Sequence, residues 1–294
     1  MKEPNLLYDI TNWWCKIKIY SDGTKERRWS DPEYPECIDL KITNYCDAWC
    51  AWCHEKSTVE GKHASLDNIY NILRDAPAWT EFALGGGNPL DHPDLIDILS
   101  MMKGSDLITN LTVNAVHLGR YKSLLDKIIK EGLVFWLGIS YNKFFKDQIK
   151  QFDYEHKVVH MIAWVNSFEE IRDVVLANKK VLILGYKTRW RGEQYFSEIV
   201  RLKIEKTKWY LPYLIGFGML CFDNLGVEQL GPQRFFTDKN WGKMYMWDDG
   251  QHTMYIDAVT NTYAMTSFAK ERNNFITLKQ SFDDVRSQRV SVWD

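Results

Sequence analysis

The sequence predicts an α/β fold in which strand-like and helix-like segments alternate along most of a 294-residue chain. The alternation begins at residue 38 and contains six apolar, strand-like segments. The hydrophobic fraction is 45%, which is enough for one full core. Alternating strands and helices form parallel sheets with right-handed crossovers. Six such strands fit an incomplete barrel, and an open, doubly wound sheet remains the alternative because a single sequence does not reveal strand order.

The individual elements follow from hydrophobic periodicity. In the first expected helix, Ile69, Ile72 and Leu73 share one face. The strands are expected at 38–43, 81–85, 110–114, 134–140, 157–164 and 180–185. The helices between them are expected at 65–76, 93–103, 121–131, 144–152 and 168–177.

The two ends of the chain depart from this alternation. Residues 13–20 alternate like a strand, and residues 21–24 have the composition of a hairpin turn. Beyond residue 192 we expect a helix at 195–208, a strand at 219–222, and a hairpin in which 244–246 and 253–256 flank an Asp-Gly turn. The expected organisation is an N-terminal cap hairpin (1–37), a core (38–192) and a C-terminal α+β elaboration packed on the core (193–294).

Composition excludes several classes of protein. The net charge of −2 gives no overall basic field, so nucleic acid is possible but not indicated as a partner. No apolar stretch approaches the roughly 18 residues of a membrane span. The N-terminus lacks the apolar region of a signal peptide, so we expect a cytoplasmic protein. Cys15, Cys37 and Cys221 are scattered and are expected to be small buried residues rather than ligands of a second cluster.

The most informative motif is the run Cys46-Asp-Ala-Trp-Cys50-Ala-Trp-Cys53-His54, which follows the first core strand. Cysteine thiolates are the usual ligands of iron–sulfur clusters. Three of them can hold three irons of a [4Fe–4S] cube, which leaves the fourth iron open to another ligand. Cys46, Cys50 and Cys53 are therefore candidate metal ligands and catalytic residues.

Other chemistries also use closely spaced cysteines. The segment from Cys50 to His54 matches the C-x-x-C-H pattern of c-type haem attachment, but that pattern leaves Cys46 unexplained. A structural zinc site usually has two separated ligand pairs, and no second C-x-x-C is present. A disulfide does not suit a reducing compartment. These alternatives stay open at this point.

The C-x3-C-x2-C spacing, with Trp52 just before the third cysteine, resembles the radical S-adenosylmethionine (radical SAM) superfamily. The resemblance implies an incomplete (β/α)6 barrel, a [4Fe–4S] cluster and SAM bound to its fourth iron. It also implies reductive cleavage of SAM to a 5′-deoxyadenosyl radical that abstracts hydrogen from a substrate. Trp52 would lie near the adenine, and an electron donor of the flavodoxin or ferredoxin type would reduce the cluster.

A glycine-rich segment follows the second core strand at residues 85–89. Glycines allow the backbone to approach a ligand closely and to expose N–H groups, although a tight turn needs them equally. The segment resembles the Gly-Gly-Glu motif with which the superfamily holds the methionine amino group of SAM. That resemblance assigns Gly86, Gly87 and Asn88 to SAM. Asn88 stands where the family has Glu, and its amide accepts a hydrogen bond but carries no charge.

Polar residues follow later strands, whose C-terminal ends form the active face of a barrel. The resemblance assigns Asn114 and Ser140 to SAM binding. A turn-forming role is the alternative for the Asn residues. Substrate contacts are expected from residues near the last core strands, where Arg residues suit a carboxylate or phosphate. These substrate candidates are Asn142, Lys187, Arg189, Arg191 and Asp223.

The resemblance covers residues 38–190 and leaves the substrate open. Cations beside aromatic residues favour a polar small molecule, a nucleoside or a nucleotide, and a base within a nucleic acid is also possible. A peptide-modifying enzyme or a glycyl-radical activase is the alternative within the superfamily. A non-catalytic iron–sulfur sensor or electron-transfer module is the alternative of another class.

Overall fold

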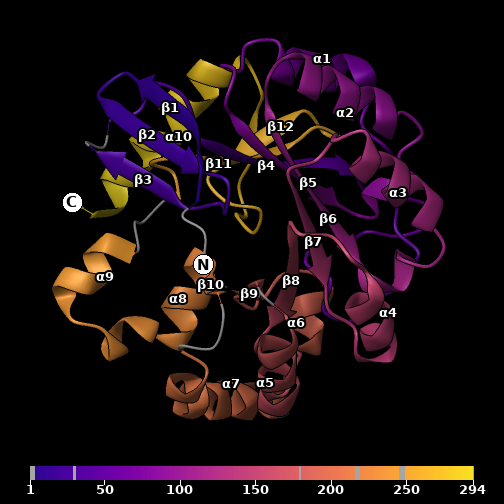
Figure 1. Ribbon diagram of the computed structural model, residues 1–294. Helices are drawn as coiled ribbons and strands as arrows, with labels where there is room; N and C mark the ends of the chain where they lie inside the picture. The colour runs from indigo at the N-terminus through magenta and orange to yellow at the C-terminus, as the bar shows by residue number, and fades with distance from the viewer. Residues whose placement is uncertain (1–3, 29–30, 179, 216–218, 245–248, 294) are drawn as a thin grey trace.

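A computed structural model describes residues 4–28, 31–178, 180–215, 219–244 and 249–293 of the protein (Figure 1). Its main feature is a ten-stranded sheet with the order β10-β9-β8-β7-β6-β5-β4-β11-β12-β13. Strands β4 to β10 and β11 pair in parallel, so eight neighbouring strands form the wall of a partial barrel. No helix in the described ranges is both long and apolar enough to cross a membrane.

The predicted core strands and helices are confirmed, with ends shifted by a few residues. The strands are β4 (Cys37–Thr43), β5 (Glu81–Gly86), β6 (Ile108–Asn114), β7 (Trp136–Ser140), β8 (Lys157–Ile162) and β9 (Lys180–Leu184). The helices are α1 (Leu66–Leu73), α2 (Leu95–Gly104), α3 (Lys122–Lys130), α4 (Lys146–Gln151) and α5 (Phe168–Ala177). Each strand pairs with the next along the chain, which resolves the choice between a partial barrel and a doubly wound sheet.

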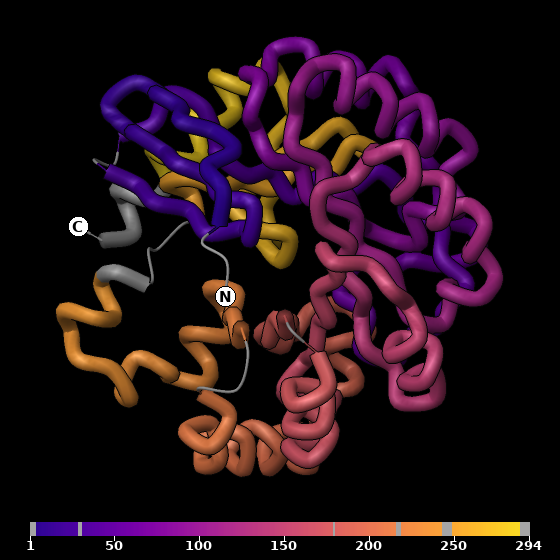
Figure 2. The backbone as a smooth tube through the Cα atoms, in the orientation of Figure 1, coloured from indigo at the N-terminus to yellow at the C-terminus, as the bar shows by residue number. Residues whose placement is uncertain are grey.

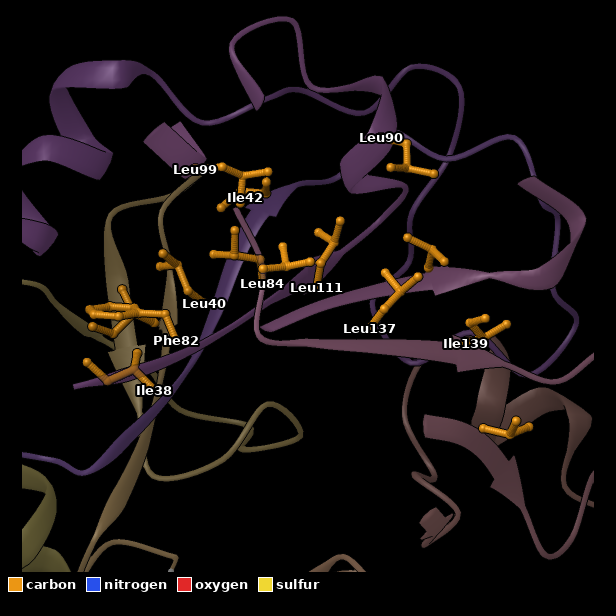
Figure 3. Close-up of a cluster of buried hydrophobic side chains, with 14 of the residues drawn as sticks. Ile38, Leu40, Ile42, Phe82, Leu84, Leu90, Leu99, Leu111, Leu137 and Ile139 are labelled. Carbon is orange, nitrogen blue, oxygen red and sulfur yellow. The ribbon is translucent and has the colours of Figure 1, made fainter. Parts of the chain in front are cut away.

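Alternate residues of the strands form the core beneath the helices. On β4, Ile38, Leu40 and Ile42 are almost fully buried, and Figure 3 shows them near Phe82 and Leu84 of β5. Because successive side chains of a strand point to opposite faces, the residues between them point into the barrel. The helices therefore cover an apolar outer face, while the inner face carries polar residues.

The N-terminal residues form a three-stranded antiparallel sheet rather than a single hairpin. Its strands are β1 (Leu6–Asn12), β2 (Cys15–Tyr20) and β3 (Lys25–Arg28). Gly23, in the predicted turn, has φ +88°, and a Cβ atom there would lie 2.7 Å from Cζ2 of Trp136. Trp136 begins β7, so the sheet lies at the end of the barrel where the strands start, which we call the base (Figure 2).

The main sheet continues past residue 192. After α6 (Arg191–Tyr195) and α7 (Glu198–Tyr210), β10 (Met219–Phe222) pairs with β9. Two helices follow, α8 (Asn224–Leu230) and α9 (Asp238–Met244). The last elements are β11 (Thr253–Asp257), β12 (Thr262–Ala264), β13 (Asn273–Asn274) and α10 (Leu278–Trp293).

The hairpin expected around residues 244–256 is wrong in its pairing. Met244 ends α9, and residues 245–248 lie outside the described residues. Residues 253–256 do form a strand, β11, but it pairs with β4 in parallel and with β12 in an antiparallel hairpin. The pairing of β11 therefore depends on β4, a strand that lies over two hundred residues earlier in the chain.

Candidate active site

The three motif cysteines lie in the segment 44–58 after β4, which we call the cluster loop, at the mouth of the barrel where the strands end. All three are partly buried and have free thiols. Burial raises the pKa of Cys46 and Cys50, the latter to about 11, and the charges of neighbouring Cys53 and Cys46 add to the shift at Cys50. The ionisation of each of these two thiols is thus affected by other cysteines of the same loop.

The surroundings of the thiols fit a cluster held by three cysteines. Asn114, at the end of β6, places its Nδ2 donor 3.5 Å from Sγ of Cys50. The charge of Arg191 lowers the pKa of both Cys46 and Cys50, against the effect of burial. A positive charge and an N–H donor both favour thiolates, the form in which cysteine binds iron.

Asp47, inside the motif, fixes one side of the cluster loop. Its Oδ1 lies 2.8 Å from Nε2 of His117 and accepts a hydrogen bond of 3.2 Å from Nη2 of Arg120, while Nη1 of Arg120 donates to Oδ2 at 2.5 Å. The Arg120 hydrogen bonds, helped by His117, lower the pKa of Asp47 to about 2. Asp47 was not predicted as a site residue, although its acidic side chain stands between the first two motif cysteines.

Arg191 fixes the opposite side of the cluster loop. Its Nε donates to the carbonyl oxygen of Cys50 at 3.1 Å, and its Nη2 donates to that of Ser57 at 3.0 Å. Gly192 follows closely, since a Cβ atom there would lie 3.3 Å from the Trp52 carbonyl oxygen. The rings of Trp52 and Tyr195 meet edge to face at 5.7 Å. Helix α6 therefore packs directly on the cluster loop.

The other two cations of this segment bind the C-terminal part of the chain. Nζ of Lys187 donates to Oγ of Ser267 at 2.8 Å and lies 3.5 Å from Nε2 of His54. Nη1 of Arg189 donates to the carbonyl oxygens of Ser267 at 3.2 Å and of Ala269 at 2.5 Å. All three cations expected to hold a substrate anion are thus already bonded to protein acceptors.

The glycine-rich segment lies against the cluster loop. Gly86 has φ +107°, and a Cβ atom on it would lie 2.4 Å from the Thr43 carbonyl oxygen; on Gly87 it would lie 2.1 Å from that of Tyr45. The N–H groups of Gly87 and Asn88 donate to those same oxygens at 2.7 and 2.6 Å. The N–H groups of Gly87 and Asn88 are therefore not free, because the end of β4 and the start of the cluster loop accept them, which agrees with the alternative of a tight turn.

Side-chain oxygens of the predicted polar residues cap the turns that follow their strands. Oδ1 of Asn88, Asn114 and Asn142 each accepts from the backbone N–H two residues later, and Oδ1 of Asp223 accepts from the N–H groups of Gly185 and Gly226. Asn88 also donates to Asp91 at 2.6 Å. Only Asn114 among them is recorded in contact with a motif cysteine. Ser140 lies at the end of β7, paired between Asn114 and His160.

A buried ionic network supports the site from the C-terminal strand. Nζ of Lys41 lies 2.8 Å from Glu55 and 3.2 Å from Asp257, and Asp257 also binds Arg272 at 2.8 Å. The pKa of Glu55 lies below its usual range despite burial, because His54 and Lys41 contact it. The network joins β4, the cluster loop and β11. The sequence analysis missed it because the three partners are far apart in the chain.

Comparisons with known proteins agree with this arrangement. The family model described as the Radical SAM superfamily matches residues 40–186. A PqqA peptide cyclase of Gluconobacter oxydans (strain 621H) is 27% identical over 106 residues, which is 35% of this chain and 29% of that protein. The chain thus spans less than a third of this curated relative.

Solved structures show the same fold. Streptococcus suis SuiB bound to S-adenosylmethionine superposes with a TM-score of 0.64 at 16% identity, covering 89% of this chain and 69% of SuiB. The structure titled native anSMEcpe with bound AdoMet and Cp18Cys peptide superposes with a TM-score of 0.56 at 12% identity, covering 86% of this chain and 82% of that one. Family match, cysteine motif and barrel together lead to one conclusion: the chain belongs to the radical SAM superfamily, a family that uses a [4Fe–4S] cluster and SAM as cofactors.

Proposed function

We propose that this enzyme abstracts hydrogen from a C–H bond of a peptide. The proposal rests on the contacts of the three cations that were expected to bind an anionic group of the substrate. Lys187, Arg189 and Arg191 each bond to carbonyl or hydroxyl groups of the protein itself. A phosphate would have to displace those contacts, so the main reason to expect a nucleotide is lost.

The inner face of the barrel supports a neutral or basic substrate group. Asp39 of β4 lies between Ile38 and Leu40, which face the helices, and so it points into the barrel. Its side chain has no hydrogen bond or ion pair within the described part of the chain. The surrounding protein raises the pKa of this carboxyl group, against the charge of Lys187, so the group suits a neutral or basic partner better than an anion.

The comparisons point the same way. The curated relative is titled a peptide cyclase, and two of the solved structures are titled as complexes with the precursor peptide SuiA and with the Cp18Cys peptide. These likenesses support a peptide together with the protein contacts of Lys187, Arg189 and Arg191.

Each part of the mouth has a proposed role. The cluster and SAM supply the radical chemistry. Cys46, Cys50 and Cys53 would hold the cluster, with Asn114 donating to the Cys50 sulfur. Trp52, Gly86, Gly87, Asn88 and Ser140 would border SAM. Asp47 and Arg191 would hold the cluster loop in place, which transfers Arg191 from substrate binding to positioning. A flavodoxin- or ferredoxin-type donor would supply the electron.

The test uses the anaerobically reconstituted protein with dithionite and SAM. We expect 5′-deoxyadenosine to form, and to form faster when short peptides encoded near the gene are added, with a change in peptide mass. A Cys53→Ala variant is the control and should form none. Stimulation by nucleosides or nucleotides but not by any peptide would refute the peptide proposal. Absence of 5′-deoxyadenosine under every condition would favour the sensor alternative.

A further inference from the structure

Three ionisable side chains meet at the base of the barrel, away from the active site. Cys15 begins β2, Glu36 immediately precedes β4, and His252 immediately precedes β11. They are 0%, 3% and 1% exposed, respectively. One potential ligand atom of each lies within 4.8 Å of the other two. The three residues come from the N-terminal sheet and from two strands of the barrel wall.

Two of the three distances between these atoms agree with a tetrahedral metal site, and the third, from Cys15 to His252, lies within 4.8 Å. Sγ of Cys15 lies 3.7 Å from Oε1 of Glu36, and Nδ1 of His252 lies 3.1 Å from the same oxygen. With zinc bonds of about 2.3 Å to sulfur and about 2.0 Å to oxygen and nitrogen, tetrahedral angles give about 3.5 Å for S···O and about 3.3 Å for N···O. Both observed distances therefore agree with these values to within a few tenths of an ångström.

Hydrogen bonding in the described ranges only partly satisfies the ring of His252. Nε2 of His252 has no hydrogen-bond partner in the described ranges, and Nδ1 has only the poorly aligned 3.1 Å contact with Oε1 of Glu36, which nevertheless helps to lower the pKa of that carboxyl group. A buried polar group without a partner is unfavourable. A metal ion between the three side chains would use a nitrogen lone pair of the ring.

Arg27 binds one of the three candidate ligands, Glu36, from outside the cluster. Its Nε lies 2.8 Å from Oε1 and 2.6 Å from Oε2 of Glu36, so it fixes the orientation of the carboxylate. Ligand carboxylates in metal sites are commonly held by a hydrogen-bond donor in this way. Arg27 lies on β3, so the N-terminal sheet supplies both this donor and the thiol.

We propose that Cys15, Glu36 and His252 bind a zinc ion, with a water molecule as fourth ligand, and that the ion fastens the N-terminal sheet to the barrel. Cysteine, histidine and carboxylate together are ligands that zinc accepts. The site lies before β4 and the cluster loop lies after it, so the two sites are separated by the length of that strand. The ion would join the N-terminal sheet to the barrel at a distance from the radical reaction.

The first experiment measures iron and zinc per chain in the purified, reconstituted protein after dialysis against zinc. We expect about one zinc in addition to about four irons. In the Cys46→Ala, Cys50→Ala, Cys53→Ala triple variant, iron should be lost and the one zinc retained. His252→Ala in either background should remove the zinc, and Cys221→Ala should keep it. Zinc well below one per chain, or zinc that survives His252→Ala, would overturn the proposal.

The second experiment remains informative if a site variant does not fold. Cobalt(II) added to the triple variant should give an absorption band from thiolate ligation with tetrahedral d–d bands, and Cys15→Ser should abolish the thiolate band. A chelator should lower the Tm of the triple variant but not that of its His252→Ala derivative. Cobalt spectra without thiolate character, or a Tm that the chelator leaves unchanged, would show that the three side chains form a metal-free network.

Discussion

The two ends of the barrel hold their polar groups in different ways. At the mouth, Arg189 and Arg191 bond mainly to backbone carbonyl oxygens, and the glycine-rich segment packs on the backbone of the cluster loop. At the base, Cys15, Glu36 and His252 meet side chain to side chain. Backbone contacts and the ion pairs of Asp47 and Glu55 hold the cluster loop, and both leave its cysteine side chains available for a ligand. A side-chain cluster at the base instead joins separate parts of the fold.

This difference predicts where substitutions affect chemistry and where they affect assembly. Changes at the mouth should alter cluster content and SAM use, with little loss of folding. Changes at the base should alter attachment of the N-terminal sheet, with the cysteine motif intact. The following predictions are arranged from the largest expected effect to the smallest.

Replacing a motif cysteine should have the largest effect. Cys50→Ala removes one of three ligands, so we expect cluster iron to fall from about four per chain to near zero and SAM cleavage to stop. Iron and sulfide analysis after anaerobic reconstitution measures this. Cys221→Ala is the matched control and should keep both. Full iron content and turnover in Cys50→Ala would show that the ligand assignment is wrong.

Arg191→Ala should loosen the cluster loop without unfolding the barrel. Two hydrogen bonds from a charged group to the Cys50 and Ser57 carbonyls are lost, each worth about 1.5–3 kcal/mol. We expect faster amide exchange in residues 46–57 of the cluster-free protein and faster loss of iron to a chelator. Arg201→Ala, at an exposed pair with Glu198, should change neither. If exchange stays at the wild-type rate, Arg191 does not hold the loop.

Asn88→Ala separates two roles of the glycine-rich segment. Loss of the cap on the turn after β5 should lower the free energy of unfolding by about 1 kcal/mol. If the amide also contacts SAM, the SAM dissociation constant should rise as well. Asn88→Ser keeps a capping oxygen but not the amide, so it should restore stability and not SAM affinity. If both variants bind SAM with wild-type affinity, Asn88 only caps the turn and does not contact SAM.

His160 should give a smaller, pH-dependent effect. Burial lowers its pKa to about 4, against about 6.5 in the unfolded chain. Neutral His160 therefore contributes stability fully above about pH 6.5, and this contribution is lost as pH falls from there through about 4. In the cluster-free triple variant, chemical unfolding between pH 7 and pH 4.5 should lose less stability when His160→Asn is added. Equal loss in both proteins would contradict the shifted pKa.

Much of the fold and the centre of the site were accessible from the sequence alone. The core strands and helices follow from local hydrophobic periodicity, and the three cysteines follow from spacing within eight residues. Both signals are short in range, so no tertiary information was needed. The same holds for the Asn residues, whose local turn-capping chemistry the sequence already offered as an alternative.

The tertiary structure alone decided the contacts between distant segments. It placed β11 beside β4, joined Lys41 to Asp257, and brought Arg191 to the Cys50 carbonyl oxygen of the cluster loop. It also brought His252 to Cys15 and Glu36. Charge and residue type show what a side chain can bond to, but its actual partner depends on which backbone groups the fold brings within hydrogen-bond reach.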